Sequence, residues 1–383
     1  MVKKGIHSKC VHEGEIHDEQ FGGAVSPVFM ATSYPFLGDG PKRYPRYFNT
    51  PNQEVIGKKI AALENAEAAL PFASGIAAIS TALLAFLKKG DHVVFQNEIY
   101  GGAHNFVVKE FKDYGIEFDF TDGVEVADFE AKIKKNTKVI YIETPSNPLL
   151  TITDVKAVAE LAGKYGLVSM IDNTFASPIN QTPLDLGIDI SIHSATKYLG
   201  GHSDILAGAV AGSQEHIGRI FQKGINYGGN LSDFMAYLLE RSIKTLALRV
   251  EKHNANAQLI AEYLQKHSSV RKVYYPGLKD HPGHRIATEQ MHGFGGMISF
   301  ELRPDLDAIT FQKSLKMIKP SMSLAGVEST ILMPSVTSHG LLTPEERAEI
   351  GISDHLLRFS VGIEDQEDII ADLEQTFDAI WEK

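Results

Sequence analysis

The feature that most constrains this chain is the alternation of short apolar runs and amphipathic runs between residues 91 and 172. The apolar runs predict strands, and the amphipathic runs predict helices between them: strands at 91–95, 116–120, 138–143 and 167–171, and helices at 106–114, 126–135 and 154–165. Short connections between such elements predict a mostly parallel sheet with helices on both faces. Because ligands bind outside the carboxyl ends of such strands, we expect the functional residues at that edge.

A lysine follows the next β-branched run, which extends from Ile188 to Ile192. Lys197 stands among small polar residues and is followed by Gly200 and Gly201. A lysine amine in such a turn binds an anion as a point charge, or attacks a carbonyl group to form an imine. A solvated loop lysine has the same local sequence, so its assignment depends on the residues that share its edge of the sheet.

Four further features fall at that edge. They are an aromatic ring, an amide, a carboxylate and a helix start suited to an anion, provided by Tyr100, Asn147, Asp172 and Ser74-Gly75. Each is an ordinary loop, turn or capping residue when it is considered alone. Together with Lys197, they match a molecule with an aromatic ring, a ring nitrogen, an aldehyde and a phosphate group. The sequence therefore predicts a site for pyridoxal 5′-phosphate (PLP).

Length and composition limit the remaining possibilities. A chain of 383 residues allows two domains, and we expect an N-terminal arm at 1–50, a PLP-binding domain at 51–245 and a C-terminal α/β domain at 246–383. The net charge of −11 argues against a nucleic-acid partner. The single cysteine excludes an intrachain disulfide and favours a cytoplasmic protein, and no apolar run is long enough to span a membrane.

Eight motifs in order along the chain resemble those of the PLP-dependent enzymes of Cys/Met metabolism, such as cystathionine γ-lyase, methionine γ-lyase, cystathionine γ-synthase and cystathionine β-lyase. The matching stretches are Tyr44-Pro45-Arg46, Phe72-Ala73-Ser74-Gly75, Tyr100-Gly101-Gly102, Glu143-Thr144-Pro145-Ser146-Asn147-Pro148, Asp172-Asn173-Thr174-Phe175, Ser194-Ala195-Thr196-Lys197-Tyr198, Ser323-Leu324-Ala325-Gly326-Val327-Glu328-Ser329 and Leu357-Arg358-Phe359-Ser360-Val361-Gly362. The resemblance implies the type I fold of PLP-dependent transferases. That fold has a large domain with a mostly parallel seven-stranded sheet, a smaller C-terminal α/β domain and an extended N-terminal arm. It also implies a homotetramer built from dimers that share active sites.

The resemblance further implies a role for each site residue. Lys197 would bind the cofactor covalently and move protons, Tyr100 would stack on its ring and assist proton transfer, and Asp172 would pair with the ring nitrogen. The phosphate group would be held by Ser74, Gly75, Ile76, Ser194 and Thr196, with Tyr44 and Arg46 reaching it from a neighbouring subunit. The substrate carboxylate would be bound by Arg358, with Asn147 and Ser323 nearby.

Three positions bear on which reaction the chain performs. Where cystathionine γ-lyase and cystathionine γ-synthase have an arginine five residues after the stacking tyrosine, this chain has Asn105, and where cystathionine γ-lyase tends to have a glutamate it has Met322. Where methionine γ-lyase has a cysteine, this chain has Gly102. An apolar Met322 suits a thioether tail. We therefore expect α,γ-elimination on L-methionine or L-cystathionine, which gives 2-oxobutanoate, ammonia and a thiol.

Other functions stay open at this point. Within the same family they are cystathionine γ-synthase, an O-acetylhomoserine thiol transferase and cystathionine β-lyase. An aminotransferase of the same fold and a phosphate-binding regulatory module belong to different classes. His281 and His284 have the spacing of metal ligands, but Pro282 favours a loop and no cysteine cluster accompanies them, so we expect no metal site.

Overall fold

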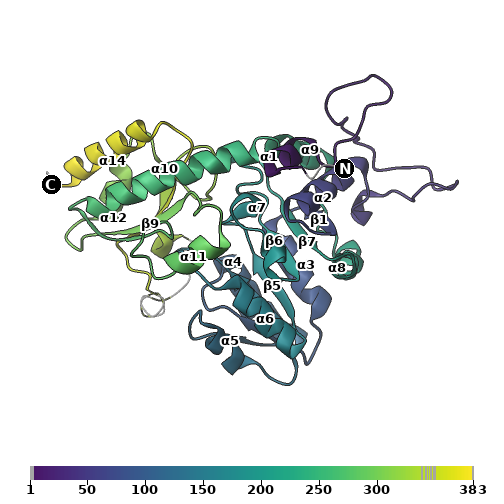
Figure 1. The fold of residues 1–383 in the computed structure, drawn as a ribbon, viewed down its shortest axis with the longest axis horizontal. Coiled ribbons are helices and arrows are strands. Elements are labelled where there is room, and N and C mark those ends of the chain that lie inside the picture. The colour runs from purple at the N-terminus through teal and green to yellow at the C-terminus, as the bar shows by residue number, and fades with distance from the viewer. Residues whose placement is uncertain are drawn as a thin grey trace.

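The computed structural model describes residues 4–381, except 338–339, 341–342, 344, 346 and 348–350. It contains a seven-stranded sheet in the order β1-β7-β6-β5-β4-β2-β3 and a five-stranded sheet in the order β10-β11-β12-β9-β8. The long helix α10 (Leu246–Lys266) leads from the half of the molecule with the large sheet to the half with the small sheet (Figure 1). The predicted fold class, with a large, mostly parallel sheet and a second, smaller sheet, is confirmed.

The large sheet is parallel except for β7, which runs antiparallel to both of its neighbours. Its strands are β1 (Ala68–Phe72), β2 (His92–Phe95), β3 (Glu117–Phe120), β4 (Thr137–Glu143), β5 (Val168–Asp172), β6 (Ile190–His193) and β7 (Gly208–Gly212). The sequence did not predict β1, because Pro71 within it has no N–H group to donate. An edge strand tolerates that proline, since only one side of an edge strand pairs with the sheet.

Helices cover both faces of the large sheet, as the alternation predicts. Strand β4 shows why, since Val139 and Tyr141 pack into the core on one face while Ile140 and Ile142 pack into the core on the other. The first core also receives α3 (Gly75–Phe86), α4 (Gly101–Tyr114) and α8 (Gln214–Tyr227). The second core receives α5 (Val126–Lys132) and α6 (Val155–Tyr165).

The small sheet has an apolar core of its own, built against α10 and the last helix. Its strands are β8 (Val270–Tyr274), β9 (Met297–Leu302), β10 (Lys319–Pro320), β11 (Thr330–Leu332) and β12 (Leu356–Ser360). Its further helices are α11 (His284–Gln290), α12 (Ala308–Ser314) and α14 (Gln366–Trp381). Residues 233–266 form two helices in succession, α9 (Asp233–Ile243) and α10. The division of the chain at residues 245 and 246 remains a prediction.

The N-terminal segment, which the sequence predicts to be an extended arm, also contains an α-helix. Helix α1 (Ile6–His12) packs against α2 (Pro51–Leu63) and α10, with Cys10 buried in the contact. The ammonium group of the buried Lys59 donates hydrogen bonds of 2.9 and 3.2 Å to the carbonyl groups of Cys10 and Val11. Lys59 therefore binds the carboxyl end of α1, where the unpaired carbonyl groups of a helix gather.

The rest of the N-terminal segment projects from the body of the molecule (Figure 1). Several of its large apolar side chains are exposed, including Phe21, Met30, Phe36 and Leu37. None of the helices among residues 4–337 and 351–381 combines the length and the apolar character that crossing a bilayer requires.

Candidate active site

One cavity of about 430 Å³ lies where the carboxyl ends of the parallel strands meet the start of α3. All of the predicted site residues except Tyr44 and Arg46 line it: Ser74, Gly75, Ile76, Tyr100, Asn147, Asp172, Ser194, Thr196, Lys197, Ser323 and Arg358. They come from positions 74 to 358, so the fold brings together side chains that are far apart in the sequence.

The start of α3 forms one end of this cavity. The hydroxyl oxygen of Ser74 accepts the N–H group of Ala77 at 3.1 Å. Gly75 and Ile76 line the cavity and lie in the first turn of the helix, where backbone N–H groups have no partner within the helix. A Cβ atom on Gly75 would lie 2.8 Å from Cβ of Ser194, so only glycine allows this close approach. Backbone N–H groups at a helix start, flanked by hydroxyl groups, form a cradle for a phosphate group.

Lys197 extends into the cavity from the loop after β6. Its ammonium group donates to the Ser323 hydroxyl oxygen at 2.8 Å. The loop is held by Thr196, whose backbone N–H and hydroxyl groups both donate to the carbonyl oxygen of Ala207 at 3.0 Å. Burial, and then the charge of Arg358, lower the pKa of Lys197 from 10.5 to about 8. A useful fraction of the amine is therefore neutral, and nucleophilic, near neutral pH.

Asp172 is the last residue of β5 and is 5% exposed. One of its oxygens accepts the backbone N–H group of Thr174 at 3.0 Å, and the Thr174 hydroxyl oxygen accepts the N–H group of Ser194 at 2.8 Å. Burial raises the pKa of Asp172, while these Thr174 contacts and the charges of His193 and Lys197 oppose that rise. Thr174 was not predicted as a site residue, although its place two residues after a strand-end carboxylate is a usable signal.

Tyr100 precedes the first turn of α4, and its ring folds back over Gly102. A Cβ atom on Gly102 would lie 2.5 Å from Cε1 of Tyr100, so the ring occupies the space that a larger residue would need. The ring is 44% exposed and lines the cavity. Burial of the hydroxyl group, and then the charge of Asp172, raise the pKa of Tyr100, which keeps the phenol protonated.

Arg358 lies in the middle of β12, where it is 5% exposed. Its two terminal nitrogens donate to the Asn147 side-chain oxygen at 2.9 Å and to the Ser323 carbonyl oxygen at 3.1 Å. Burial lowers the pKa of Arg358 to about 10, which leaves it charged at neutral pH. A charged guanidinium fork that opens into a cavity suits a carboxylate ligand. The backbone of Ser323 has a φ of 76°, a left-handed value that presents both its carbonyl and its hydroxyl group to the site.

Tyr44 and Arg46 lie outside this cavity in the single chain. Arg46 donates a hydrogen bond to the carbonyl oxygen of Ile225, and its guanidinium group lies 5.2 Å from the centre of the Tyr47 ring. Tyr44 is 45% exposed. Their contact with a phosphate group in a neighbouring subunit remains a prediction.

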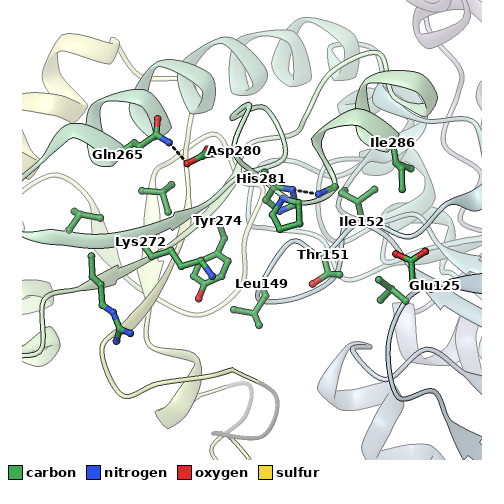
Figure 2. Close-up of a pocket in the computed structure, with 16 residues that line it drawn as sticks. Glu125, Leu149, Thr151, Ile152, Gln265, Lys272, Tyr274, Asp280, His281 and Ile286 are labelled. Atoms are coloured by element: carbon green, nitrogen blue, oxygen red, sulfur yellow. Dashed lines mark hydrogen bonds between the residues drawn. The ribbon is translucent and has the colours of Figure 1, made fainter. Parts of the chain in front are cut away.

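A second cavity, of about 490 Å³, lies between the loop after β4 and the segment around β8 (Figure 2). Its charged groups have partners within the chain. The Lys272 ammonium group lies 4.3 Å from the centre of the Tyr274 ring, and the Gln265 amide donates to Asp280 at 2.7 Å. Arg271 likewise lies 3.7 Å from Glu301, so these three charged groups of the second cavity already have partners within the chain.

The two histidines considered as metal ligands lie beside this second cavity. His281 Nδ1 accepts the N–H group of Gly283 at 3.1 Å, and His284 Nδ1 donates to the Pro276 carbonyl oxygen at 2.8 Å. Burial lowers the pKa of His281 to about 4, so its ring is neutral. In the part of the chain that the structure describes, no group of three histidine, cysteine or acidic residues is arranged to hold a metal ion.

Comparison with known proteins indicates the same cofactor as the residues of the cavity do. Residues 7–378 match the family described as Cys/Met metabolism PLP-dependent enzyme. The chain belongs to this family. The resemblance seen in the motifs is therefore confirmed, and the cofactor is PLP.

Members of the Cys/Met family with different activities are about equally similar to this chain. Cystathionine β-lyase of Lactococcus lactis is 42% identical over 377 residues, which cover 97% of this chain and 99% of that protein. L-Methionine γ-lyase of Porphyromonas gingivalis is 39% identical over 395 residues, which cover 99% of this chain and 98% of that protein. The crystal structure of cystathionine γ-lyase from Lactobacillus plantarum, complexed with L-serine, has a TM-score of 0.95 at 41% identity and covers 99% of this chain and 100% of that chain.

The first cavity fits the cofactor of the Cys/Met family. The start of α3 suits its phosphate group, the buried carboxylate of Asp172 would suit its ring nitrogen, and the amine of Lys197 would suit its aldehyde. Arg358 and Met322 line the same cavity.

Proposed function

We propose that this member of the Cys/Met family is a carbon–sulfur lyase that performs α,γ-elimination, with L-methionine as its preferred substrate and L-cystathionine as the second candidate. Water and L-methionine would give 2-oxobutanoate, ammonia and methanethiol. Relatives whose names describe cystathionine and methionine lyases support the class of substrate. The choice between L-methionine and L-cystathionine depends on the wall of the cavity that would face the substrate side chain.

The observation that carries this choice is the distribution of charge in the cavity. Among the described lining residues, the acidic and basic ones are Glu143, Asp172, Lys197 and Arg358. These four are adjacent to the cofactor groups or bind the α-carboxylate. The other described lining residues are neutral, and they include Asn105, Leu206 and Met322. A neutral wall suits the uncharged thioether of methionine, whereas the distal amino and carboxylate groups of cystathionine would find no charged partner there.

The residues of the chain divide the work of the reaction. When bound, PLP supplies an electron-withdrawing ring that stabilises negative charge on the substrate α carbon. Arg358 and Asn147 orient the substrate through its α-carboxylate. The neutral amine of Lys197 takes the α proton and later moves protons between Cα and Cβ, for which a pKa of about 8 is suitable.

The carbon–sulfur bond breaks after the proton has left Cβ. The electron pair of the Cγ–S bond leaves with sulfur, which must gain a proton to depart as a thiol. Tyr100 supports this step because its phenol is kept protonated and lines the same cavity. The Ser323 hydroxyl group holds the Lys197 amine on the substrate side of the cavity.

The test is a panel of L-methionine, L-homocysteine, L-cystathionine and O-acetyl-L-homoserine, assayed for keto acid, ammonia and thiol. The proposal expects 2-oxobutanoate as the main keto acid, with the highest kcat/KM for L-methionine. Pyruvate as the main product from cystathionine would instead identify a β-lyase, which the relatives at 42% identity also support. Condensation of O-acetylhomoserine with a thiol, with little elimination in its absence, would identify a γ-replacement enzyme.

A further inference from the structure

A second buried carboxyl group lies next to Asp172. Glu143 is the last residue of β4, and its Cα atom pairs with that of Asp172 across the parallel strands β4 and β5. Both side chains are buried, at 4% and 5% exposure, and both line the cofactor cavity. Two carboxylates side by side in a buried site cannot both hold their charge without a large cost in free energy.

Glu143 also anchors the segment that carries Tyr100. Its carboxyl oxygen Oε2 accepts the backbone N–H group of Tyr100 at 2.6 Å. The backbone of Glu143 is in turn bound on both sides by Gln96, which donates to its carbonyl oxygen at 2.8 Å and accepts its N–H group at 3.3 Å. Three hydrogen bonds therefore fix the segment 96–100 to the end of β4, and this segment sets the position of the Tyr100 ring.

The surroundings of the two carboxyl groups differ. Asp172 accepts the Thr174 N–H group, and positive charges on Lys197 and His193 favour its ionised form. The charged and titratable groups that act on or respond to Glu143 are the side chains of Asp172, Glu98, Arg358, Tyr100 and Tyr141. Burial, and then the charge of Asp172, raise the pKa of Glu143 well above its ordinary value, and hydrogen bonds from the backbone N–H groups of Tyr100 and Asn147 oppose this rise without cancelling it. The single charge of the pair therefore belongs on Asp172.

We propose that Glu143 is a positioning residue that works as an uncharged carboxylic acid: it fixes Tyr100 through its backbone and leaves Asp172 as the only negative charge at the ring nitrogen of the cofactor. The proposal builds on the roles of Asp172 and Tyr100 in the proposed function. It does not depend on which sulfur amino acid is the substrate. Glutamine has nearly the shape of a protonated glutamate and keeps the oxygen that accepts the Tyr100 N–H group, so it separates the neutral form from the charged form.

The first experiment is infrared spectroscopy of the holoenzyme at neutral pH, which detects the C=O stretching band of a protonated carboxyl group. The wild type is expected to show this band, and Glu143→Gln is expected to lose it. The matched control is Glu98→Gln, which removes a partly exposed carboxyl group that accepts from Ser146 and Thr151 in the same region and is expected to keep the band. A wild type without the band, a band that persists in Glu143→Gln, or one that disappears in Glu98→Gln overturns the proposal.

The second experiment compares kinetics and the absorption spectrum of the bound cofactor across pH. Glu143→Gln is expected to keep kcat/KM within about threefold of the wild type and to titrate at the same pH. Glu143→Ala leaves the Tyr100 N–H group without its partner and is expected to lower kcat about 10- to 100-fold while KM changes little. A Glu143→Gln enzyme as impaired as Glu143→Ala, or with a displaced spectral titration, shows that the charge of Glu143 is needed. The infrared measurement on the wild type requires neither a variant nor a substrate, so misfolding of a variant or failure of the proposed reaction does not affect it.

Discussion

The two sides of the active cavity differ in how firmly their residues are held. On the side of the large sheet, Asp172 ends one buried parallel strand and Lys197 follows another, and hydrogen bonds of Thr174 and Thr196 flank them. On the side of the small sheet, Met322 lies in a loop and is 71% exposed, and the adjacent Ser323 has a left-handed backbone. The residues proposed to carry the chemistry thus lie on this rigid side, at the end of a buried strand or in a loop fixed by hydrogen bonds, and the residue that would meet the substrate side chain lies in an exposed loop.

This contrast has a consequence for substitution. Changes on the rigid side should remove activity towards every substrate, because they affect the reacting atoms. Changes in the loop should alter the ratio between substrates while the chemical step survives. The predictions below test this difference, beginning with the largest expected effect.

Replacing Lys197, the amine on the rigid side, should have the largest effect on activity. Lys197→Ala is expected to lower kcat at least about 10³-fold for all substrates, because it removes both the nucleophile and the proton carrier. Borohydride treatment should no longer attach the cofactor to the protein, as measured by mass spectrometry. Lys89→Ala, at an exposed lysine, serves as the control. Retention of the covalent link in Lys197→Ala would contradict the assignment.

Replacing Arg358, whose guanidinium group bridges the two sides of the cavity, should have the second-largest effect on activity. Arg358→Lys is expected to raise KM about 30- to 100-fold for every amino-acid substrate, since lysine keeps the charge but loses the two-pronged contact. Steady-state kinetics with L-methionine and L-cystathionine measure this change. Arg285→Lys, at an exposed residue paired with Glu289, is the control. An increase in KM for only one of the substrates would place Arg358 at the side-chain end instead.

The pH dependence of cofactor attachment tests the environment of the rigid side. Only the neutral amine attacks an aldehyde, and the pKa of Lys197 is lowered from 10.5 to about 8. The rate at which cofactor-free protein takes up PLP should therefore fall about tenfold per pH unit below pH 8 and level off above it. Stopped-flow absorbance measures this rate. A rate that keeps rising towards pH 10 would show that the amine has an ordinary pKa.

The exposed arm provides a test across subunits. Arg46→Ala is expected to weaken PLP binding about five- to tenfold if its guanidinium group meets the phosphate of a neighbouring subunit. Mixing Arg46→Ala with Lys197→Ala under conditions of subunit exchange should then restore activity, because hybrid dimers contain one site with both residues. No recovery in hybrids verified by mass spectrometry would mean that each chain completes its own site.

The smallest effect is expected in the loop. Met322→Glu should lower kcat/KM for L-methionine about threefold and raise it for L-cystathionine by a similar factor, because a carboxylate at the neutral wall pairs with the distal ammonium group. Met322→Leu, which keeps the wall apolar, is the control. Equal losses for both substrates would show that this loop takes no part in selection.

Much of the large sheet and its edge was predictable because the signals are local. A continuous apolar run such as 138–143 needs cover on both faces, and alternation with helices then fixes a parallel sheet and the edge where its ligands bind. Strand β1 was not predictable in this way, because its pairing with β7 is a long-range contact and Pro71 weakens the local signal. The helix in the N-terminal segment was also missed, since its stability depends on the buried Lys59 of another helix.

The sequence by itself determined which residues are available for chemistry: a lysine, an aspartate and a helix start at the ends of local elements. Only the tertiary structure decided their neighbours. The pairing of Arg358 with Asn147, the contact of Ser323 with Lys197 and the position of Glu143 beside Asp172 each join segments from different strands or loops. Local patterns do not encode such pairs, because the energy of a buried charge depends on what the rest of the chain places within a few ångströms of it.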